Sequence, residues 1–210
     1  MALRDFCRRT GLHVITTFMG KGVIDADDEH FLFTAGLRAQ NYPQGIMGRA
    51  DLMVCVGYDL VEWAPSAWNP DGKLKILCID TAPPEIDAHY VPQVELIGNL
   101  NHILNQLGCM LWNKPLASFR VPPYQKAFDV VLHVGEDDDA PVKPQRVLHD
   151  LRRVLAPEDI LVSDVGAHKL WVARFWEAHE PNTVLISNGF AAMGFGLPAA
   201  IAASLASHGS

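Results

Sequence analysis

Short apolar runs, several of which end at a glycine or an aspartate, are the feature that most restricts how this chain can fold. The runs cover residues 12–17, 51–57, 75–80, 94–98, 160–163 and 184–186. Continuous apolar runs of this length, rich in β-branched residues, are typical of parallel strands that are buried on both faces. The chain is therefore expected to build parallel β-sheets.

Helical signals separate these runs. Expected helices cover residues 2–10, 99–107, 144–155 and 169–178, and a further helix is expected in the Ala-rich tail. Gly11 ends the first of them, Asn99 caps the second, and Pro144 stands in the first turn of the third. In the fourth, Leu170, Ala173 and either Phe175 or Trp176 are expected to point inward. Alternating strands and helices predict an α/β fold with parallel sheets.

A proline-rich and acidic stretch divides the chain into two such parts. Residues 113–143 contain four prolines and the run Glu-Asp-Asp-Asp, and are expected to be a linker. The part before it, residues 1–112, begins with a helix where an α/β domain normally begins with a strand. The part after it, residues 144–210, stops after two strands. Both parts are thus expected to be incomplete, and the chain to be a piece of a longer protein.

Charge and cysteine content exclude several classes of function. The chain has 17 Lys and Arg against 24 Asp and Glu, a net charge of −7, which argues against a nucleic-acid partner. The four cysteines (Cys7, Cys55, Cys78 and Cys109) show no Cys-x-x-Cys spacing, and two of them lie within apolar runs. Reduced, buried thiols in a cytoplasmic protein are therefore expected, rather than disulfides or a zinc site.

The end of the chain is the only stretch apolar enough to suggest a membrane span. Residues 181–210 contain no Asp, Glu, Lys or Arg, and a span needs roughly 20 apolar residues. Glycines and a proline interrupt the stretch, so a buried strand, a turn and a packed helix are expected, with no membrane partner. The amino terminus lacks the long apolar segment of a secretory signal.

Two turns at strand ends are the best candidates for a binding site. Residues 164–168 (Asp-Val-Gly-Ala-His) join a strand to a helix amino terminus, where free N–H groups and the positive helix end favour a diphosphate. Residues 187–194 follow the next strand, and adjacent strand ends form the crevice where open α/β folds bind ligands. Met193 is the bulky apolar residue among the small residues 189, 191, 192, 194 and 196, and packing in the core is the alternative role for it.

The remaining candidates carry weaker signals. The sequence has no phosphate-binding loop, no Gly-x-Gly-x-x-Gly at a helix start and no zinc-protease or nucleophile-elbow motif. Residues 20–22 (Gly-Lys-Gly) are too short for a phosphate loop, and a plain turn after a strand and a functional role remain equal alternatives for them. Asp80 is expected to cap a turn rather than to bind a ribose. Trp63 and Trp68 are expected to cover the core or a subunit contact.

Taken together, the two turns resemble a known family. Residues 164–171 (Asp-Val-Gly-Ala-His-Lys-Leu-Trp), 187–189 and 193–200 are similar to the start of the diphosphate-binding domain of thiamine-diphosphate enzymes. Residues 19–22 and 57–63 resemble their middle domain, in particular that of the catabolic, flavin-free acetolactate synthases. The resemblance implies a three-layer, parallel-sheet middle domain without its first strand, followed by an incomplete α/β domain that binds thiamine diphosphate.

The resemblance also implies roles for individual residues. Cofactor contacts are implied for Val165, Gly166, Ala167, His168, Ala191 and Met193. The first four would contact the diphosphate, Ala191 would offer its backbone carbonyl to the aminopyrimidine, and Met193 would hold the cofactor in a bent conformation. The Mg²⁺ ligands of the family would lie beyond Ser210, so no metal ligand and no complete catalytic set are expected in this chain.

The implied activity is carboligation of two pyruvate molecules to 2-acetolactate and CO₂, in branched-chain amino acid or acetoin metabolism. The chain alone is expected to be inactive, and the parent enzyme to be a homodimer or homotetramer. FAD is not expected, because flavin-containing relatives carry an arginine where this chain has Tyr58 and Asp59. Another thiamine-diphosphate 2-oxo-acid decarboxylase, or a non-catalytic nucleotide-binding module, remains an alternative.

Overall fold

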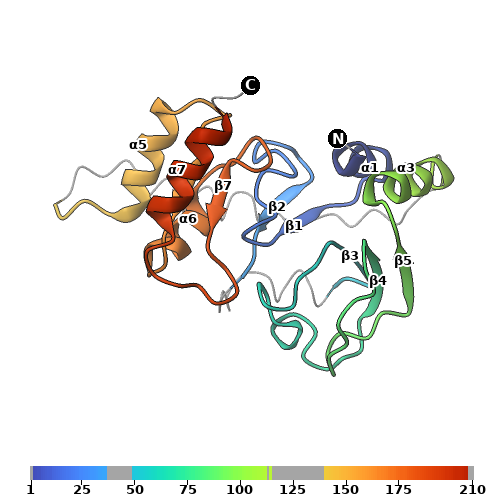
Figure 1. The fold of residues 1–210 in the computed structure, drawn as a ribbon. Helices are drawn as coiled ribbons and strands as arrows, with labels where there is room; N and C mark the ends of the chain where they lie inside the picture. The colour runs from blue at the N-terminus through green and yellow to red at the C-terminus, as the bar shows by residue number, and fades with distance from the viewer. Residues whose placement is uncertain (1, 37–48, 113, 115–139, 208–210) are drawn as a thin grey trace. The chain divides into compact units, whose positions relative to one another are not determined.

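The computed structural model describes residues 2–36, 49–112, 114 and 140–207, whose contacts divide the chain into two compact units (Figure 1). The first unit combines residues 1–12 with 36–120, and the second combines residues 13–35 with 121–210. Most of the expected linker, 113–143, lies outside the described residues. The compact units group residues 13–35 with the carboxy-terminal part of the chain. The domain boundaries expected from the sequence, 1–112 and 144–210, stay a prediction.

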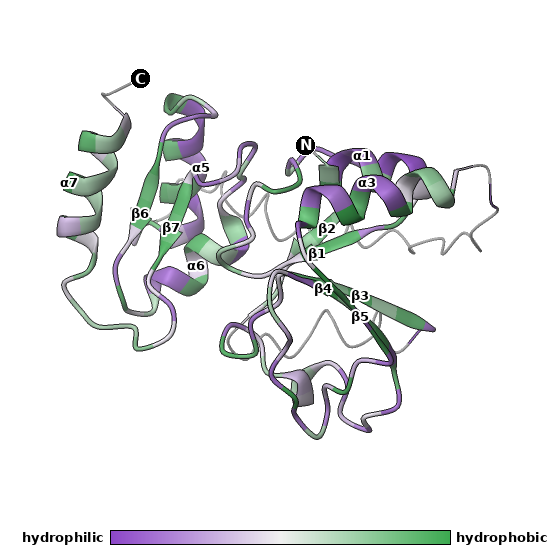
Figure 2. Ribbon diagram, turned by 45° about the vertical axis from the view of Figure 1, so that its right-hand side comes forward, coloured by the Kyte–Doolittle hydropathy of each residue, from purple (hydrophilic) through white to green (hydrophobic). Residues whose placement is uncertain are grey.

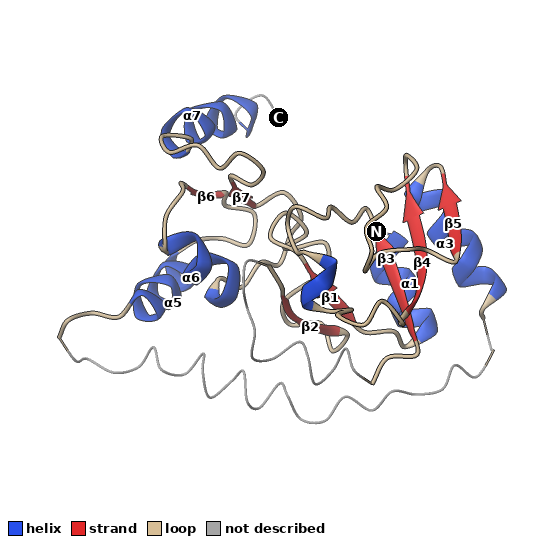
Figure 3. Cartoon of the chain, turned by 90° about the horizontal axis from the view of Figure 1, so that it is seen from below, coloured by secondary structure: helices blue, strands red, loops and turns tan. Residues whose placement is uncertain are grey.

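The first unit is built on a parallel three-stranded sheet with the strands in sequence order. Its strands are β3 (Leu52–Val56), β4 (Lys75–Asp80) and β5 (Val94–Ile97), and the short 3-10 helix η1 (Pro65–Ala67) lies between β3 and β4. Helices α1 (Ala2–Thr10) and α3 (Leu100–Met110) pack against each other on the same side of this sheet (Figure 3). The parallel α/β pattern expected from the sequence is confirmed.

Burial in this sheet is uneven. The central strand β4 buries Ile76, Cys78 and Ile79, whereas β3 buries only Cys55. The expectation of strands buried on both faces therefore fails for β3, because an edge strand is covered by fewer neighbours than the central strand. All four cysteines are free thiols, as expected, but Cys109 is exposed rather than buried.

The aromatic residues after β3 form part of the core of this unit. Trp63 and Trp68 are 8% and 5% exposed. The ring of Tyr58 lies 5.9 Å from that of Trp68 and 5.2 Å from that of Tyr90. Aromatic pairs at these separations and tilts are favourable contacts. The structure thus supports the prediction that these tryptophans cover the core.

Helix α3 begins where the sequence predicts, because Asn99 caps it. The Asn99 Oδ1 atom accepts a hydrogen bond from the backbone N–H of His102 at 3.0 Å. We expect Asn99→Ala to lower the free energy of unfolding by about 1 kcal/mol, the usual value of such a cap. Urea denaturation checks this. Asn101→Ala is the control, since Asn101 is an exposed asparagine at the second position of the same helix. Equal losses in the two variants would contradict the capping role.

The second unit contains two separate parallel pairs of strands. The pair β6 (Leu161–Ser163) and β7 (Val184–Ile186) lies between α7 (Gly196–Ser207) on one face and α5 (Pro144–Val154) with α6 (His168–Phe175) on the other (Figures 2 and 3). The other pair is β1 (Val14–Thr16) and β2 (Phe31–Thr34), and β2 contacts α6. Strand β2 was not predicted from the sequence: it follows a polar stretch of the chain, and its pairing with β1 is seen only in the tertiary structure.

Phe18 explains why residues 13–35 group with the carboxy-terminal part. Its side chain is 2% exposed and packs in one cluster with Val172, Ala173 and Trp176 of the α6 region. The expectation that Ala173 and Trp176 point inward is confirmed, but Leu170 is 37% exposed and points outward. Helix α6 also ends at Phe175, three residues earlier than predicted.

Helix α7 was expected to be packed, and in this respect the prediction is wrong for the described residues. Figure 2 shows that the helix is largely hydrophobic, yet none of its residues is buried, and Leu197, Ile201 and Leu205 are more than half exposed. Among the helices of the described residues, none is both long and apolar enough to cross a membrane. A helix that is hydrophobic on all sides is normally buried, so α7 lacks a packing partner among the described residues.

Candidate functional site

The two turns singled out in the sequence leave the same edge of the β6–β7 pair. The strands are parallel, and Ser163 at the end of β6 lies opposite Ile186 at the end of β7. Residues 164–168 and 187–194 therefore start side by side, at the carboxyl edge where ligands bind in open α/β sheets.

The carboxylate of Asp164 joins these two turns. It accepts hydrogen bonds from the backbone N–H of Gly194 at 3.0 and 3.1 Å, from Gly196 at 3.1 Å and from Val165 at 2.6 Å. These donors, the Val165 N–H first among them, lower the pKa of Asp164. The sequence did not reveal this role, because the bond partners lie about 30 residues away.

Lys169 makes a second connection between the same elements. Its side chain is 7% exposed, and its Nζ donates to the backbone carbonyl of Ser187 at 3.2 Å. A buried lysine needs such acceptors to offset its desolvation. The segment from Asp164 to Lys169 is thus joined to the chain that follows β7 at two points, and the sequence had indicated an individual role for neither Asp164 nor Lys169.

The ring of His168 lies over its own turn. Its Nε2 is 2.9 Å from the backbone carbonyl oxygen of Asp164, which can only accept, so Nε2 carries the hydrogen. A Cβ atom at Gly166 would lie 2.8 Å from the ring, so the glycine leaves the room that this ring position needs.

The second turn exposes its backbone and two large apolar side chains, those of Phe190 and Met193. Ala191 has a φ of 47°, a left-handed conformation that is strained for alanine. Met193 is 86% exposed. The alternative that Met193 packs in the core is therefore wrong for the described structure, in which its side chain is exposed to solvent.

Comparison with known proteins assigns the family. Residues 1–107, half of the chain, match the central domain of the thiamine pyrophosphate enzymes, and residues 164–210 match their C-terminal TPP-binding domain. The chain belongs to the thiamine pyrophosphate enzymes. The segment that matches the TPP-binding domain of this family begins at Asp164 and contains both turns.

Curated relatives of this thiamine pyrophosphate enzyme chain are acetolactate synthases. It is 28% identical to "Acetolactate synthase" of Bacillus subtilis over 99% of the chain, and 32% identical to "Acetolactate synthase, catabolic" of Raoultella terrigena over 89%. A "Probable acetolactate synthase large subunit" of Methanocaldococcus jannaschii is 30% identical over 92%. The chain spans about a third of the length of these relatives: 37%, 34% and 34%.

The residues of the two turns fit thiamine diphosphate with one restriction. Gly166, Ala167 and His168 are exposed at the amino terminus of α6, whose positive end favours an anion. The N–H of Val165 already donates to Asp164, so this amide is engaged within the protein. Of the four diphosphate contacts implied by the family resemblance, Val165 is thus the least suited to supply a backbone donor.

Asp80, another candidate from the sequence, belongs to the first unit. Asp80 accepts a hydrogen bond from the backbone N–H of Thr81 at 2.6 Å, so it caps its own turn.

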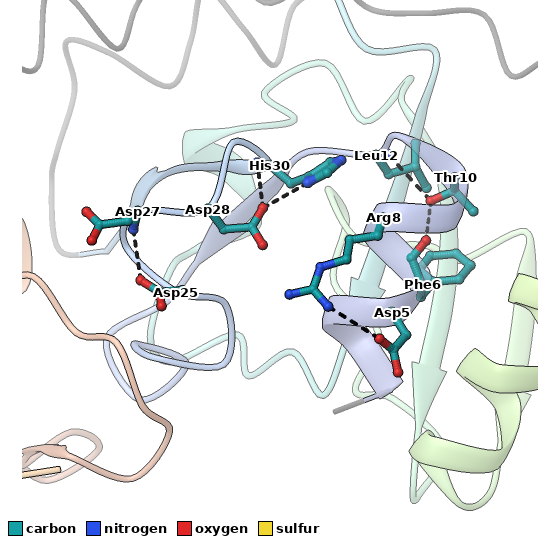
Figure 4. Close-up of polar contacts among 9 residues, drawn as sticks. All are labelled: Asp5, Phe6, Arg8, Thr10, Leu12, Asp25, Asp27, Asp28 and His30. Atoms are coloured by element: carbon teal, nitrogen blue, oxygen red, sulfur yellow. Dashed lines mark hydrogen bonds and ion pairs between the residues drawn. The ribbon is translucent and has the colours of Figure 1, made fainter. Parts of the chain in front are cut away.

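Figure 4 shows the loop before β2, where the Asp25 Oδ1 atom accepts from the N–H of Asp27 at 2.9 Å. His179 Nδ1 is 2.9 Å from the same Asp25 oxygen. This contact links the loop to residues 178–180.

Proposed function

We propose that this chain is part of an acetolactate synthase that joins two pyruvate molecules to give 2-acetolactate and CO₂. The observation that carries the proposal is the pair of turns joined by Asp164, in a segment that matches a TPP-binding domain. The names of the relatives support this chemistry over other reactions of thiamine pyrophosphate enzymes.

In this proposal each turn holds one end of the cofactor. Gly166, Ala167 and His168 bind the diphosphate, and the Ala191 carbonyl accepts a hydrogen bond from the aminopyrimidine. The exposed Met193 side chain supports the bend between the two rings. When bound, thiamine diphosphate supplies a carbon nucleophile for the pyruvate carbonyl and takes up the electron pair left by CO₂.

The wider assembly is part of the same proposal. Mg²⁺ would accompany the diphosphate, and no FAD would be bound. The parent enzyme would be a homodimer or homotetramer. The 210-residue chain by itself would not turn over pyruvate.

Cofactor binding is the direct test of the site. We expect the chain to bind thiamine diphosphate with Mg²⁺ at least about tenfold more tightly than thiamine, because charge-assisted hydrogen bonds to the diphosphate are lost with thiamine. Isothermal titration calorimetry measures both. Equal affinity for the two compounds would contradict a diphosphate site at the start of α6.

Product analysis separates the proposed reaction from its alternatives. The complete gene product, given pyruvate, thiamine diphosphate and Mg²⁺, should yield 2-acetolactate, and the chain alone should yield no product. Acetaldehyde as the main product would favour a 2-oxo-acid decarboxylase. Tight binding of ADP with no cofactor binding would favour a nucleotide-binding module.

A further inference from the structure

One histidine and two aspartates from distant parts of the sequence meet in the second unit. Asp25 and Asp27 lie in the loop between β1 and β2 (Figure 4), and His179 follows α6, 154 residues after Asp25. One donor atom from each residue, an imidazole nitrogen and two carboxylate oxygens, lies within 4.8 Å of the other two. Among the residues that the structure describes, no other group of three metal-ligating side chains comes together in this way.

The ring of His179 faces both carboxylates with the same nitrogen. Its Nδ1 lies 2.9 Å from Asp25 Oδ1 and 3.7 Å from Asp27 Oδ2. A tetrahedral zinc ion with its ligands at about 2.1 Å needs donor atoms that are about 3.4 Å apart. The two distances lie on either side of this value, so small side-chain movements bring the donors onto one ion.

Backbone contacts on both sides of the group hold the two segments together. The N–H of Ala26, between the two aspartates, donates to the carbonyl of Ala178, the residue before His179, at 3.1 Å. A Cβ atom at Gly22 would overlap the backbone oxygen of Glu180, the residue after His179, so this approach requires glycine. The fold therefore brings the donors together before any ion binds, which lowers the ordering cost of binding.

Exposure and charge of the donors favour a bound cation. The side chains of His179, Asp25 and Asp27 are 20%, 35% and 81% exposed, so an ion can reach them from solvent. Two carboxylates meet one imidazole, and even a protonated imidazole balances only one of the two negative charges. A divalent cation balances both, with the imidazole neutral.

The imidazole also limits which divalent cation fits. Mg²⁺ and Ca²⁺ prefer oxygen ligands throughout. A mixed set of imidazole and carboxylate donors instead suits Zn²⁺. Three protein donors leave a fourth tetrahedral position for water.

A cavity of about 300 Å³ adjoins the donors and gives room for such water. Asp27 and Ala178 both belong to its lining. The buried Lys21 lines it as well, but its Nζ donates to Thr34 Oγ1 at 3.2 Å and to the Ala173 carbonyl at 2.9 Å. This ammonium is thus bonded to neutral acceptors and to none of the three donors among the described residues.

We infer that Asp25, Asp27 and His179 bind one Zn²⁺ ion, with water in the remaining position. The neutral imidazole gives the lone pair of Nδ1 to the ion and carries its hydrogen on Nε2. The ion replaces the present contact between Nδ1 and Asp25, and joins the loop to the chain after α6. None of the three residues belongs to the 164–168 or 187–194 turns, so the inference does not depend on the proposed cofactor site.

Zinc titration of the chelator-treated 210-residue chain tests the inference. The titration uses a Cys109→Ser background, because Cys109 is an exposed free thiol that could bind zinc itself. Isothermal titration calorimetry should show one Zn²⁺ per chain, with no competition from an equal concentration of Mg²⁺. Asp27→Asn, at a mostly exposed position, and His179→Gln should each weaken Zn²⁺ binding at least about tenfold, since each removes one of three ligands.

The chain offers a matched control for both substitutions. His149 Nδ1 lies 3.5 Å from Asp150 Oδ1, and both side chains are exposed, but the described residues place no third donor with this pair. His149→Gln and Asp150→Asn should therefore leave the affinity for Zn²⁺ unchanged.

The ring nitrogens of His179 give a readout that does not depend on folding of the variants. In the ¹⁵N-histidine-labelled chain, the His179 Nδ1 signal should move until one equivalent of Zn²⁺ is added and return with EDTA, while that of His149 stays in place. The inference is wrong if Asp27→Asn binds Zn²⁺ as tightly as its parent chain, if Mg²⁺ competes at equal concentration, or if the His179 signal does not respond.

Discussion

Replacing Lys21 with methionine is expected to remove about 3 kcal/mol of the rise in stability between pH 7 and pH 9.5. Burial lowers the pKa of Lys21 to about 7 in the folded chain, against about 10.4 in an unfolded chain. Between these two values the unfolded chain binds a proton that the folded chain does not. Lys21 therefore penalises folding fully below about pH 7, and the penalty fades as the pH rises toward 10.

Urea denaturation at several pH values measures this difference. The free energy of unfolding of the Lys21→Met variant should rise less steeply with pH than that of the unaltered chain. Lys73→Met is the control, since Lys73 is exposed and its surroundings change little on unfolding; it should follow the unaltered chain. Parallel pH curves for the Lys21 variant and the unaltered chain would show that the Lys21 ammonium is not desolvated.

The second large effect is expected from Asp164→Ala. Without the carboxylate, the N–H groups of Gly194 and Gly196 lose their acceptor, and the turn after β7 is no longer joined to the end of β6. We expect thiamine diphosphate to bind at least about tenfold more weakly, because the two halves of the proposed site must then be ordered on binding. Calorimetry measures the affinity.

Amide hydrogen exchange tests the same contact without any cofactor. The amides of Gly194 and Gly196 should exchange faster in Asp164→Ala, since they lose their hydrogen bonds. Asp159→Ala is the matched control: its carboxylate accepts from the N–H of Ala156 at 2.7 Å in the turn before β6, away from residues 187–196. Unchanged exchange at Gly194 in the Asp164 variant would contradict the proposed connection.

Acid should act on this contact in the same direction as the substitution. Backbone donors lower the pKa of Asp164, so its contribution is present above the unfolded value of about 3.9 and is lost as the pH falls through the lowered folded value. Faster exchange at Gly194 is therefore expected only in strong acid.

Local sequence patterns were sufficient for most elements of the fold. The apolar run at β4 and the helix signals of Asn99 and Pro144 depend on near neighbours in the chain, and the structure confirms each of them. Strand β2 and the end of α6 were not predicted correctly. Both depend on packing in the second unit, where Phe18 and Trp176 share a core, and such packing leaves no local signal.

The candidate site shows the same division. Motif similarity pointed to residues 164–168 and to Met193, because short turns that hold a cofactor have a specific local sequence. The role of Asp164 could not be predicted, since its acceptor atoms meet N–H groups about 30 residues away. The buried position of Lys21 depends on Ala173, 152 residues further along the chain.

The parallel α/β architecture and the turn motifs of a thiamine pyrophosphate enzyme could be predicted from the sequence. Short apolar runs, helix caps and turn glycines each depend on only a few neighbouring residues, so they can be recognised in the sequence. Which donors and acceptors meet depends on the tertiary structure: Asp164 accepts from N–H groups of the second turn, and Lys21 donates to Thr34 and to the carbonyl of Ala173. Burial and hydrogen bonding of these groups are set by residues distant in the sequence, brought together by the core.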